Sequence, residues 1–577
     1  SQIWVAAGTY FPDRGTGQVR RDRTSTFRLK NGVALFGGFP SGGSPFEQRD
    51  PAAEPTILSG NIGSSSSKTD NSYHVLTGTG IDRSACVDGF TITGGYARQA
   101  NSPDDKGGAL ICHNSGSPTI SNCLFVANEA ADEGGAIYSS DASRLLVTDS
   151  VFRENLATSA GGAVSNFTSI AEFIGCQFID NRAEFAGAFY NAYSQTVATN
   201  CSFQGNEADY GGAVYNFDFR SLEDPTFIQC DFVGNRASWG GAMYGWSSSP
   251  ILRNCCFHGN EAIRGGGALL STNGWGAYLY NSIIWNNLAA GASDSSSATL
   301  ALYSDSEFFA YNSLVANSGG SGNWNPNFYA DRGGNIDADP LFLLEVDPSQ
   351  APTTGGDLRL LPGSPAIGAG HNDLIATGVE TDQRGAPRIV GDTVDMGVFE
   401  NLPELITGSS SAEYQPELSV KIEIAQLLAT ISGGAGLPLS ITSVSTVDNP
   451  GSSVRISGRY IVYTPAAGQL GNGQFTFVAT DGFQEVEGTV AVSPRRDGGA
   501  AGSNITSVTV VGGTATIQAV GIPGRTYQLQ CSPDLHDWTN RGENQICPAG
   551  GVMEFLDPGP LPETCYYRLI HSSGAID

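Results

Sequence analysis

Gly134-Gly-Ala-Ile-Tyr138 and Phe152-Arg-Glu-Asn155 are single copies of two alternating signatures that decide the fold. The first signature, Gly-Gly-Ala-apolar with one Ala-Gly-Ala variant, starts at Gly107, Gly134, Gly161, Ala186, Gly211, Gly240 and Gly266. The second, Phe-x-x-Asn, contains Phe125, Phe152, Phe178, Phe203, Phe232 and Phe257, followed by Asn128, Asn155, Asn181, Asn206, Asn235 and Asn260. Successive copies lie 25 to 29 residues apart. A fixed period of this size indicates a solenoid of stacked units.

The sequence between these signatures favours short β-strands. Apolar and polar residues alternate in runs such as Ala136-Ile-Tyr138 and Cys201-Ser-Phe203, and Gly, Asn and Ser separate the runs. This is the two-residue period of strands rather than the 3.6-residue period of helices, and there is no leucine ladder. About three short strands in each repeat predict an all-β fold, a right-handed parallel β-helix whose coils stack about 4.8 Å apart.

Stacked coils bring like residues into columns. The Phe residues should form an inward aromatic stack, and the residue two positions earlier lies on the same strand face. That second column contains Cys123, Cys176, Cys201, Cys230 and Cys255. The Asn column should lie at a tight corner in left-handed conformation, with its amides bonded along the stack. The residues after Asn alternate in charge from Arg182 to Glu261, which predicts salt bridges between coils, each worth about 0–1 kcal/mol.

Several stretches resemble secreted bacterial proteins. The paired Gly-Gly-Ala-Ile and Phe-x-x-Asn units resemble the passenger repeats of polymorphic outer-membrane proteins. Residues 1–400 resemble bacterial β-helix proteins with a choice-of-anchor Q region, through Ile3-Trp-Val-Ala-Ala-Gly-Thr-Tyr10, Asp88-Gly-Phe-Thr-Ile-Thr-Gly-Gly95, Gly363-Ser-Pro-Ala-Ile-Gly368 and Asp395-Met-Gly-Val-Phe-Glu400. The resemblance implies a secreted or cell-surface β-helix. It implies no particular reaction, because that family is defined by architecture.

The chain changes character after the solenoid. Residues 1–400 are assigned to the β-helix, with terminal coils and a lid at about 336–400. A linker at 401–412 precedes alternating strands at 413–494, where Tyr463-Thr-Pro465 resembles cadherin-like or immunoglobulin-like modules. A second linker at 495–503 precedes a unit at 504–577, whose Tyr527-Gln-Leu-Gln-Cys-Ser532 resembles small fibronectin-like modules. Two small β-sandwich domains are therefore expected after the β-helix.

Composition predicts an exported protein. The 577 residues have a formal net charge of −27. Such acidity disfavours nucleic acid and anionic membrane surfaces as partners. No apolar stretch is long enough to span a bilayer. A strand follows Ser1 directly and no signal peptide precedes it, which predicts an extracellular or cell-surface protein exported in processed form.

The 11 cysteines fall into separate groups. We expect free buried thiols in the inward column, although a bridge between neighbours such as Cys176 and Cys201 stays open. In an exported chain one disulfide is expected among Cys531, Cys547 and Cys565, with one thiol left over. No Cys-x-x-Cys pair occurs and the six histidines are scattered, so zinc is not indicated. No cofactor is predicted, and calcium remains an alternative because the chain is acidic.

The β-helix is also the scaffold of pectate lyases and polygalacturonases. Those enzymes cluster carboxylates on one outer strand face and add a base or an acid–base pair. The outward carboxylates of this chain do not recur in one column, and the nearest constellation, Asp104-Asp105-Lys106, also reads as a solvated loop. The sequence therefore predicts a protein that is not an enzyme, with a polysaccharide lyase or hydrolase as one alternative.

Aromatic residues offer a binding surface. Alternation should point Tyr138, Tyr190, Tyr215 and Tyr244 outward as a strip. Such a strip can stack on sugar rings or dock a protein, or it can simply cover the coils.

Open strand edges at the end of a β-helix recruit partners unless they are capped. We therefore predict a structural subunit of a fibre, filament or surface layer that self-associates head to tail. The alternative is a monomeric adhesin that binds glycan or protein through the tyrosine strip.

Overall fold

The computed structural model describes residues 1–99, 103–218, 224–274, 276–414, 419–447, 450–466, 468–494, 505–549, 551–561 and 564–571. The chain forms two compact units, Ser1–Asn401 and Leu402–Asp577. The predicted linker at 495–503 lies outside the described residues. Within them, no helix is long and apolar enough to cross a membrane.

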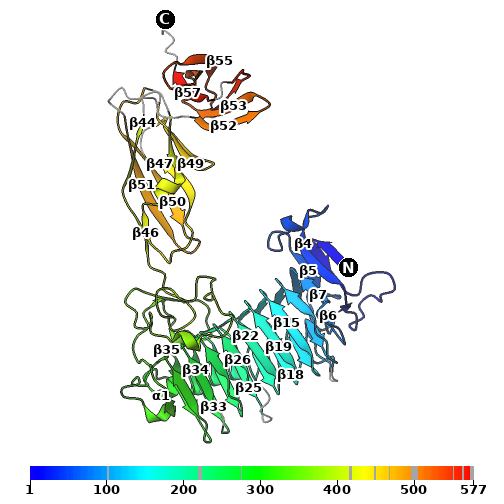
Figure 1. The fold of residues 1–577 in the computed structure, drawn as a ribbon. Helices are drawn as coiled ribbons and strands as arrows, with labels where there is room; N and C mark the ends of the chain where they lie inside the picture. Colours follow the sequence, from blue (N-terminus) through cyan, green and yellow to red (C-terminus); the bar gives the residue numbers. More distant parts are fainter. Residues whose placement is uncertain are drawn as a thin grey trace. The chain divides into compact units, whose positions relative to one another are not determined.

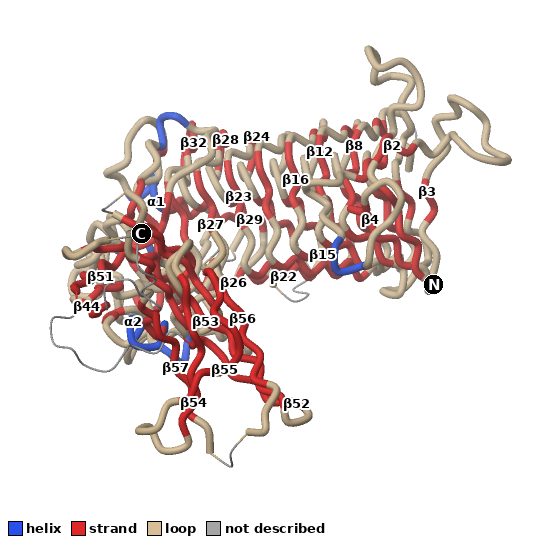
Figure 2. Tube along the Cα trace, turned by 90° about the horizontal axis from the view of Figure 1, so that it is seen from above, coloured by secondary structure: helices blue, strands red, loops and turns tan. Residues whose placement is uncertain are grey.

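The first unit is a parallel β-helix with three long sheets, in which strands from successive coils lie side by side (Figure 1, Figure 2). The first sheet contains β1 (Gln2–Ala6), β4 (Ala34–Phe39), β7 (Cys86–Asp88), β11 (Thr119–Ser121), β15 (Arg144–Thr148), β19 (Ile170–Ile174), β22 (Gln195–Thr199), β26 (Thr226–Ile228), β30 (Ile251–Arg253), β34 (Ala277–Tyr280), β38 (Phe308–Tyr311) and β40 (Ala330–Asp331). The second contains β2 (Gly8–Tyr10), β5 (Thr56–Ser59), β8 (Phe90–Thr93), β12 (Leu124–Val126), β16 (Val151–Arg153), β20 (Gln177–Ile179), β23 (Ser202–Gln204), β27 (Asp231–Val233), β31 (Cys256–His258), β35 (Ile283–Trp285) and β39 (Leu314–Val315).

The third sheet contains β3 (Phe27–Arg28), β6 (Leu76–Thr77), β10 (Leu110–Cys112), β14 (Ile137–Ser140), β18 (Val164–Phe167), β21 (Phe189–Ala192), β25 (Val214–Phe217), β29 (Met243–Trp246), β33 (Leu269–Thr272) and β37 (Leu300–Leu302). Short strands add two narrow sheets between the second and third: β9 (Tyr96–Ala97), β13 (Glu129–Ala130) and β17 (Leu156–Ala157), then β24 (Glu207–Tyr210), β28 (Arg236–Trp239), β32 (Glu261–Gly265) and β36 (Leu288–Ala289). Short helices are α1 (Ser296–Thr299), η1 (Phe46–Gln48), η2 (Pro326–Phe328), η3 (Pro348–Gln350) and η4 (Asn372–Leu374). The predicted all-β solenoid fold is confirmed.

The phenylalanine column fills the centre of the solenoid. Phe125 to Phe257 occupy one register position of the second sheet and are fully buried. Adjacent rings stack nearly parallel, with centroids 4.4–4.9 Å apart. That spacing is the distance between neighbouring strands, so backbone pairing and ring stacking share one repeat. Each stacked pair adds about 0.5–1.5 kcal/mol beyond the burial of its area.

Steric constraints explain why glycine occupies both of the first two positions of the Gly-Gly-Ala unit. The first has positive φ, for example 64° at Gly161, which only glycine adopts without cost; Ala186 takes 59° at the same place in its coil. The second glycine lies against the backbone of the next coil. A Cβ on Gly162 would overlap the carbonyl oxygen of Gly187. The repeat therefore marks a corner where coils approach too closely for a side chain.

The Asn column forms a buried amide ladder. The backbone N–H and Nδ2 of Asn181 both donate to Oδ1 of Asn206 at 3.0 Å, and Nδ2 also donates to the Phe152 carbonyl at 2.9 Å. Equivalent bonds link every step from Asn128 to Asn287. The prediction that Asn itself is left-handed was wrong. The preceding residue has the positive φ, 54° at Asp180, and this corner directs the Asn amide toward the next coil.

Residues after the last coils close the solenoid and cover part of its outside. Trp324 and Phe328 pack against the end of the core. Residues 341–400, here called the cover segment, include the antiparallel pair β41 (Phe342–Leu344) and β42 (Asp357–Leu360). Their apolar side chains pack on the outer face of the second sheet, on residues such as Cys256, Ile283 and Leu314. Terminal coils and a lid were predicted at about 336–400; the segment folds back along the outside of the coils, because that face carries apolar residues to bury.

The cover segment is fixed by buried polar contacts as well. Arg388 and Glu400 form an ion pair at 3.0 Å, and both side chains are almost completely buried. Arg388 also donates to the carbonyls of Asp395 and Gly397, and to Oε1 of Gln229 in the solenoid. The Asp395-Met-Gly-Val-Phe-Glu400 stretch therefore acts as an internal clasp. Removing one partner of such a buried pair costs about 3–5 kcal/mol.

The second unit is also all-β. Its first core lies between two main sheets and a short strand pair. One sheet contains β44 (Ser410–Tyr414), β51 (Glu485–Pro494), β50 (Gly473–Thr480) and β47 (Ser440–Thr446), and the other contains β45 (Val420–Glu423), β49 (Tyr460–Thr464) and β48 (Ser453–Ser457). The short pair is β43 (Leu405–Thr407) with β46 (Ile431–Gly433). The helix α2 (Ile424–Leu428) follows β45. The predicted linker at 401–412 contains β43 and part of β44, because residues 405–407 and 410–412 pair with strands further along the chain.

A second, smaller core follows in the same unit. One sheet contains β52 (Ile505–Val511), β53 (Thr514–Val520) and β56 (Val552–Asp557), and the other contains β55 (Thr539–Ile546), β54 (Thr526–Ser532) and β57 (Tyr566–His571). Alternate residues such as Ile517, Tyr527, Leu529 and Phe555 meet between the sheets. This is the inward alternation expected of a sandwich.

Candidate functional site

The outer face of the third sheet is lined with aromatic side chains. Register pairing brings Tyr138, Ser165, Tyr190, Tyr215 and Tyr244 into one outward column. A second outward column, two residues further along each strand, contains Phe167, Phe217 and Trp246. We call Phe167, Tyr190, Tyr193, Tyr215, Phe217, Tyr244 and Trp246 the aromatic face. Contacts between its phenylalanine and tyrosine rings have centroid distances of 4.9–6.5 Å.

The four predicted strip tyrosines are not equally accessible. Tyr215 and Tyr244 are only 5% and 6% exposed, because Phe185 and Tyr210 pack against them at centroid distances of 5.5 Å. Tyr138 and Tyr190 are half-buried. The four tyrosines thus lie in the predicted outward column, but neighbouring rings cover two of them. The accessible rings are mainly in the second column, where Phe167 and Trp246 are each 37% exposed.

A polar cluster borders one end of the aromatic face. Lys106 Nζ lies 2.6 Å from Asp132 Oδ2 and 2.7 Å from Glu133 Oε1, and 4.9 Å from the centre of the Tyr138 ring. Glu133 Oε2 accepts from Ser165 Oγ at 2.7 Å. The two carboxylates thus hold Lys106 against the tyrosine column.

Electrostatics fix the protonation state of this cluster. Burial lowers the pKa of Lys106, but hydrogen bonds to Asp132 and Glu133 outweigh that effect and hold the pKa above its usual value. The amine therefore stays protonated, which opposes its use as a catalytic base. Burial raises the pKa of Tyr138 and Tyr190 to about 12, so both hydroxyls remain protonated donors at neutral pH.

In the Asp104-Asp105-Lys106 stretch, Asp104 and Lys106 contact charged or titratable side chains from other coils. Asp104 Oδ1 lies 3.4 Å from His74 Nε2, and the other imidazole nitrogen of His74 is 2.9 Å from the carbonyl of Gly107. Lys106 contacts Asp132 and Glu133 instead of its two sequence neighbours. The stretch therefore ties neighbouring coils together.

A cleft of about 620 Å³ lies beside the cover segment. Its floor is the outer face of β20, β23 and β27, and its walls come from residues 355–358, residues 381–385 and Phe399. Three of its carboxylates are already held by internal partners. Asp231 accepts from Ser202 and Gln383, Asp357 pairs with Arg359, and Asp382 pairs with Arg384. Among the described cleft residues, these carboxylates therefore do not form an acid–base pair that is open to a substrate.

The cysteine column is buried and reduced. Cys123, Cys176, Cys201, Cys230 and Cys255 are free thiols on the inner side of the coils. Their Sγ atoms donate to backbone carbonyls; Cys176, for example, reaches Ile174 at 3.5 Å. Burial raises the pKa of Cys123 to about 12, which keeps the thiol protonated. These cysteines act as small core residues.

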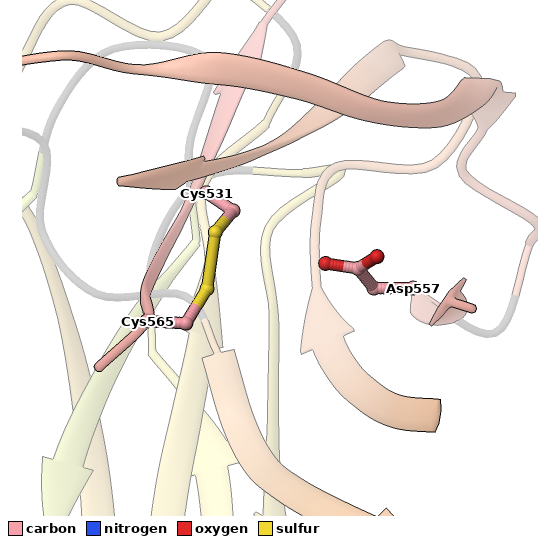
Figure 3. A group of neighbouring side chains, drawn as sticks. All are labelled: Cys531, Asp557 and Cys565. Carbon is pink, nitrogen blue, oxygen red and sulfur yellow. A yellow bond between two sulfur atoms is a disulfide. The ribbon is translucent and has the colours of Figure 1, made fainter. Parts of the chain in front are cut away.

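The C-terminal cysteines include one disulfide. Cys531 bonds Cys565, and Cys547 remains a buried free thiol. Asp557 lies beside this disulfide (Figure 3). Its carboxylate accepts from Tyr567 Oη at 3.0 Å and lies 3.5 Å from Arg541 Nε. With both sulfurs bonded and the carboxylate engaged, this group is a structural crosslink rather than a metal site.

The charged ladder is discontinuous. Arg182 pairs with Glu207 at 3.5 Å, and Arg236 pairs with Glu261 at 2.9 Å. A second amide ladder was not predicted: Asn166 donates to Asn191 and Asn191 to Asn216 at 2.9–3.0 Å. These residues lie five positions after each Gly-Gly-Ala start, so the repeat already contained the signal. No comparable signal pointed to the Asp231–Gln383 contact, which joins residues 152 positions apart.

Comparisons with known proteins assign the fold class of one region. The bacterial Ig domain family matches residues 404–493. Among solved structures, the pectate lyase Pel9A is similar with 14% identity over 69% of this chain and 88% of that chain, at a TM-score of 0.36. A chimeric titin Z1Z2 carrying a decorin peptide has 19% identity over 30% of this chain and 91% of that chain, at a TM-score of 0.12. No curated protein matches. These similarities assign no reaction or ligand to the chain.

Proposed function

We propose that this protein is a secreted or cell-surface bacterial protein that is not an enzyme and that binds glycan on the aromatic face. The observation that carries this proposal is the row of accessible rings from Phe167 to Trp246 on a rigid parallel sheet. Exposed aromatic rings stack on the apolar faces of sugars, and a few fixed polar groups supply orientation. The bacterial Ig match supports the surface location.

The geometry fits an extended chain better than a single sugar. Phe167 and Trp246 are three coils apart, which is about 14 Å at the strand spacing. The partly exposed Lys106, Asp132 and Glu133 side chains lie near the start of this row and are the polar groups that can meet sugar hydroxyls. The rings are held by one another and by the sheet, so little side-chain entropy is lost on binding.

Glycan array screening followed by calorimetry tests the proposal. Trp246→Ala and Phe167→Ala should each weaken binding of the selected glycan by about tenfold, a loss of about 1.4 kcal/mol. Leu470→Ala is the control, because Leu470 is an exposed apolar residue in the other unit, away from the aromatic face. The proposal fails if no glycan binds, or if both aromatic variants bind as tightly as the control.

Self-association into a fibre or surface layer is the second candidate. Ile3 and Trp4 on β1 are 49% and 48% exposed, which is unusual for apolar residues of a sheet. In the described chain β1 pairs on one side only, with β4. Negative-stain microscopy and light scattering should then show filaments or a mass that grows with concentration, and Trp4→Arg should abolish both. A monodisperse monomer at high concentration would exclude this candidate.

A further inference from the structure

The cleft beside the cover segment interrupts an otherwise apolar column. On the second sheet the outward positions of successive coils are Gln177, Ser202, Asp231, Cys256, Ile283 and Leu314. The last three are covered and apolar. The first three are polar and form the cleft floor. The cover segment thus ends where the column changes from apolar to polar, and the polar coils remain open.

The floor and the wall share a fixed hydrogen-bond network. The Asp231 side chain, from a residue 6% exposed, accepts from Ser202 Oγ at 2.7 Å and from Gln383 Nε2 at 2.6 Å. Gln204 Nε2 then donates to Ser202 Oγ at 2.9 Å. A buried carboxylate costs desolvation energy, which its hydrogen bonds offset. This network holds the side chains of Ser202, Gln204 and Gln383 in one orientation at the cleft surface.

Other lining groups have unused hydrogen-bonding capacity. Within the described residues, the Gln177 amide and the Thr381 hydroxyl have no hydrogen-bond partner, and both residues are exposed on the cleft. Phe399 adds a half-buried ring, with the Arg384 guanidinium 5.5 Å from its centre. Amides, hydroxyls and one ring around a cleft of about 620 Å³ suit a hydroxyl-rich ligand.

The charge of the cleft selects against acidic ligands. Four carboxylates, those of Asp149, Asp231, Asp357 and Asp382, line the cleft, and two guanidiniums, those of Arg384 and Arg359, pair with Asp382 and Asp357. Even with Asp231 neutral, the three remaining carboxylates outnumber the two cations. The carboxylates of an acidic ligand would be repelled by the carboxylates of this partly buried site. A polyuronate chain is therefore disfavoured, whereas neutral sugar hydroxyls can donate to the exposed carboxylate of Asp149.

We infer that the cleft binds an uncharged oligosaccharide at a site separate from the aromatic face. The floor residues Gln177, Ser202 and Gln204 and the wall residues Thr381 and Gln383 contact its hydroxyls, and Phe399 packs on a ring. The site is distinct because it is built on the second sheet, whereas the aromatic face is on the third. A glycan chain can therefore be held at two places on one solenoid.

Isothermal titration of the full chain tests this inference. The probes are cellotetraose, maltotetraose and chitotetraose, with tetragalacturonate as the acidic comparator. At least one neutral probe should bind with a Kd below about 1 mM, and more tightly than tetragalacturonate. Gln177→Trp, which places a large side chain on the exposed floor, and the double variant Gln177→Ala with Thr381→Val should each weaken that binding by about tenfold or more. Thermal unfolding of each variant verifies that the fold is intact.

The aromatic-face variant Trp246→Ala separates the two sites. It should leave cleft binding of the neutral probe unchanged even where it removes binding of a longer glycan. The inference is overturned if every neutral probe binds more weakly than about 1 mM, if tetragalacturonate binds more tightly, or if neither folded cleft variant weakens binding. Loss of the neutral probe from Trp246→Ala alone would also overturn it, since the site would then be the aromatic face.

Discussion

Replacing Asn181 by Ala tests whether the amide ladder, rather than the β-strand propensity of the residues, holds the coils together. The Asn181 carboxamide oxygen accepts from the backbone N–H of Asn155 at 3.0 Å, and its Nδ2 donates to the carbonyl of Phe152 at 2.9 Å. Both Asn181 and Asn155 are almost completely buried. Alanine removes these partners without admitting water, so the Asn155 N–H and the Phe152 carbonyl lose them in the interior. Asn155 Nδ2 and Asn206 Oδ1 also lose a bond, but each keeps another side-chain or backbone partner.

The expected cost follows from those two groups. A buried polar group left without its partner costs about 1–3 kcal/mol, so Asn181→Ala should lower the free energy of unfolding by about 2–6 kcal/mol. Arg182→Ala is the matched control on the next residue of the same coil. Arg182 is largely exposed and pairs with Glu207 at 3.5 Å, so its loss should cost about 0–1 kcal/mol.

Equilibrium urea unfolding of the full chain, followed by far-ultraviolet circular dichroism, measures both variants. The comparison is valid where the free energy of unfolding falls with urea concentration at the same slope as in the unmodified protein. If Asn181→Ala costs no more than Arg182→Ala, the ladder contributes little and the reasoning fails. A lowered slope would instead indicate that the solenoid unfolds in segments, as repeat proteins can.

Three further predictions follow from single contacts. Phe203→Ala should cost about 3–5 kcal/mol in urea unfolding, because it leaves a cavity inside the ring stack; a loss below 1 kcal/mol would contradict the packing. Arg388→Ala should cost about 3–5 kcal/mol, since Glu400 would stay buried without its partner, and Arg359→Ala at an exposed pair is its control. Burial lowers the pKa of His258 to about 4 from its ordinary 6.5, and its Nε2 accepts from the Val346 N–H. The unfolded chain therefore binds this proton first, so about 3 kcal/mol is lost as pH falls from 6.5 to 4, and His258→Phe should remove that part of the acid sensitivity measured by urea unfolding.

The repeat explains why so much of the solenoid could be predicted. A period of 25 to 29 residues forces equivalent side chains into columns, so the Phe and Asn ladders follow from counting. The backbone at the corner was harder to predict. Asn tolerates left-handed conformation, yet Asp180 and its equivalents take that role because the Asn amides are needed for bonds between coils.

Exposure of the tyrosine column could not be predicted from strand alternation. Alternation gives the side of the sheet on which Tyr215 and Tyr244 lie. It does not reveal that Phe185 and Tyr210, from the neighbouring corner, pack over them. The accessible rings Phe167 and Trp246 became the centre of the proposed surface only once exposure was known.

The sequence by itself determined the solenoid, its register and the division into a β-helix and trailing β-modules, because these depend on local period and on identical neighbours. The tertiary structure alone decided where the cover segment packs, which cysteines bond, and where the cleft opens. Those features depend on contacts between residues far apart in the chain, such as Gln383 with Asp231 and Val346 with His258. No periodic signal encodes such contacts, since each occurs once and is selected by shape, burial and charge.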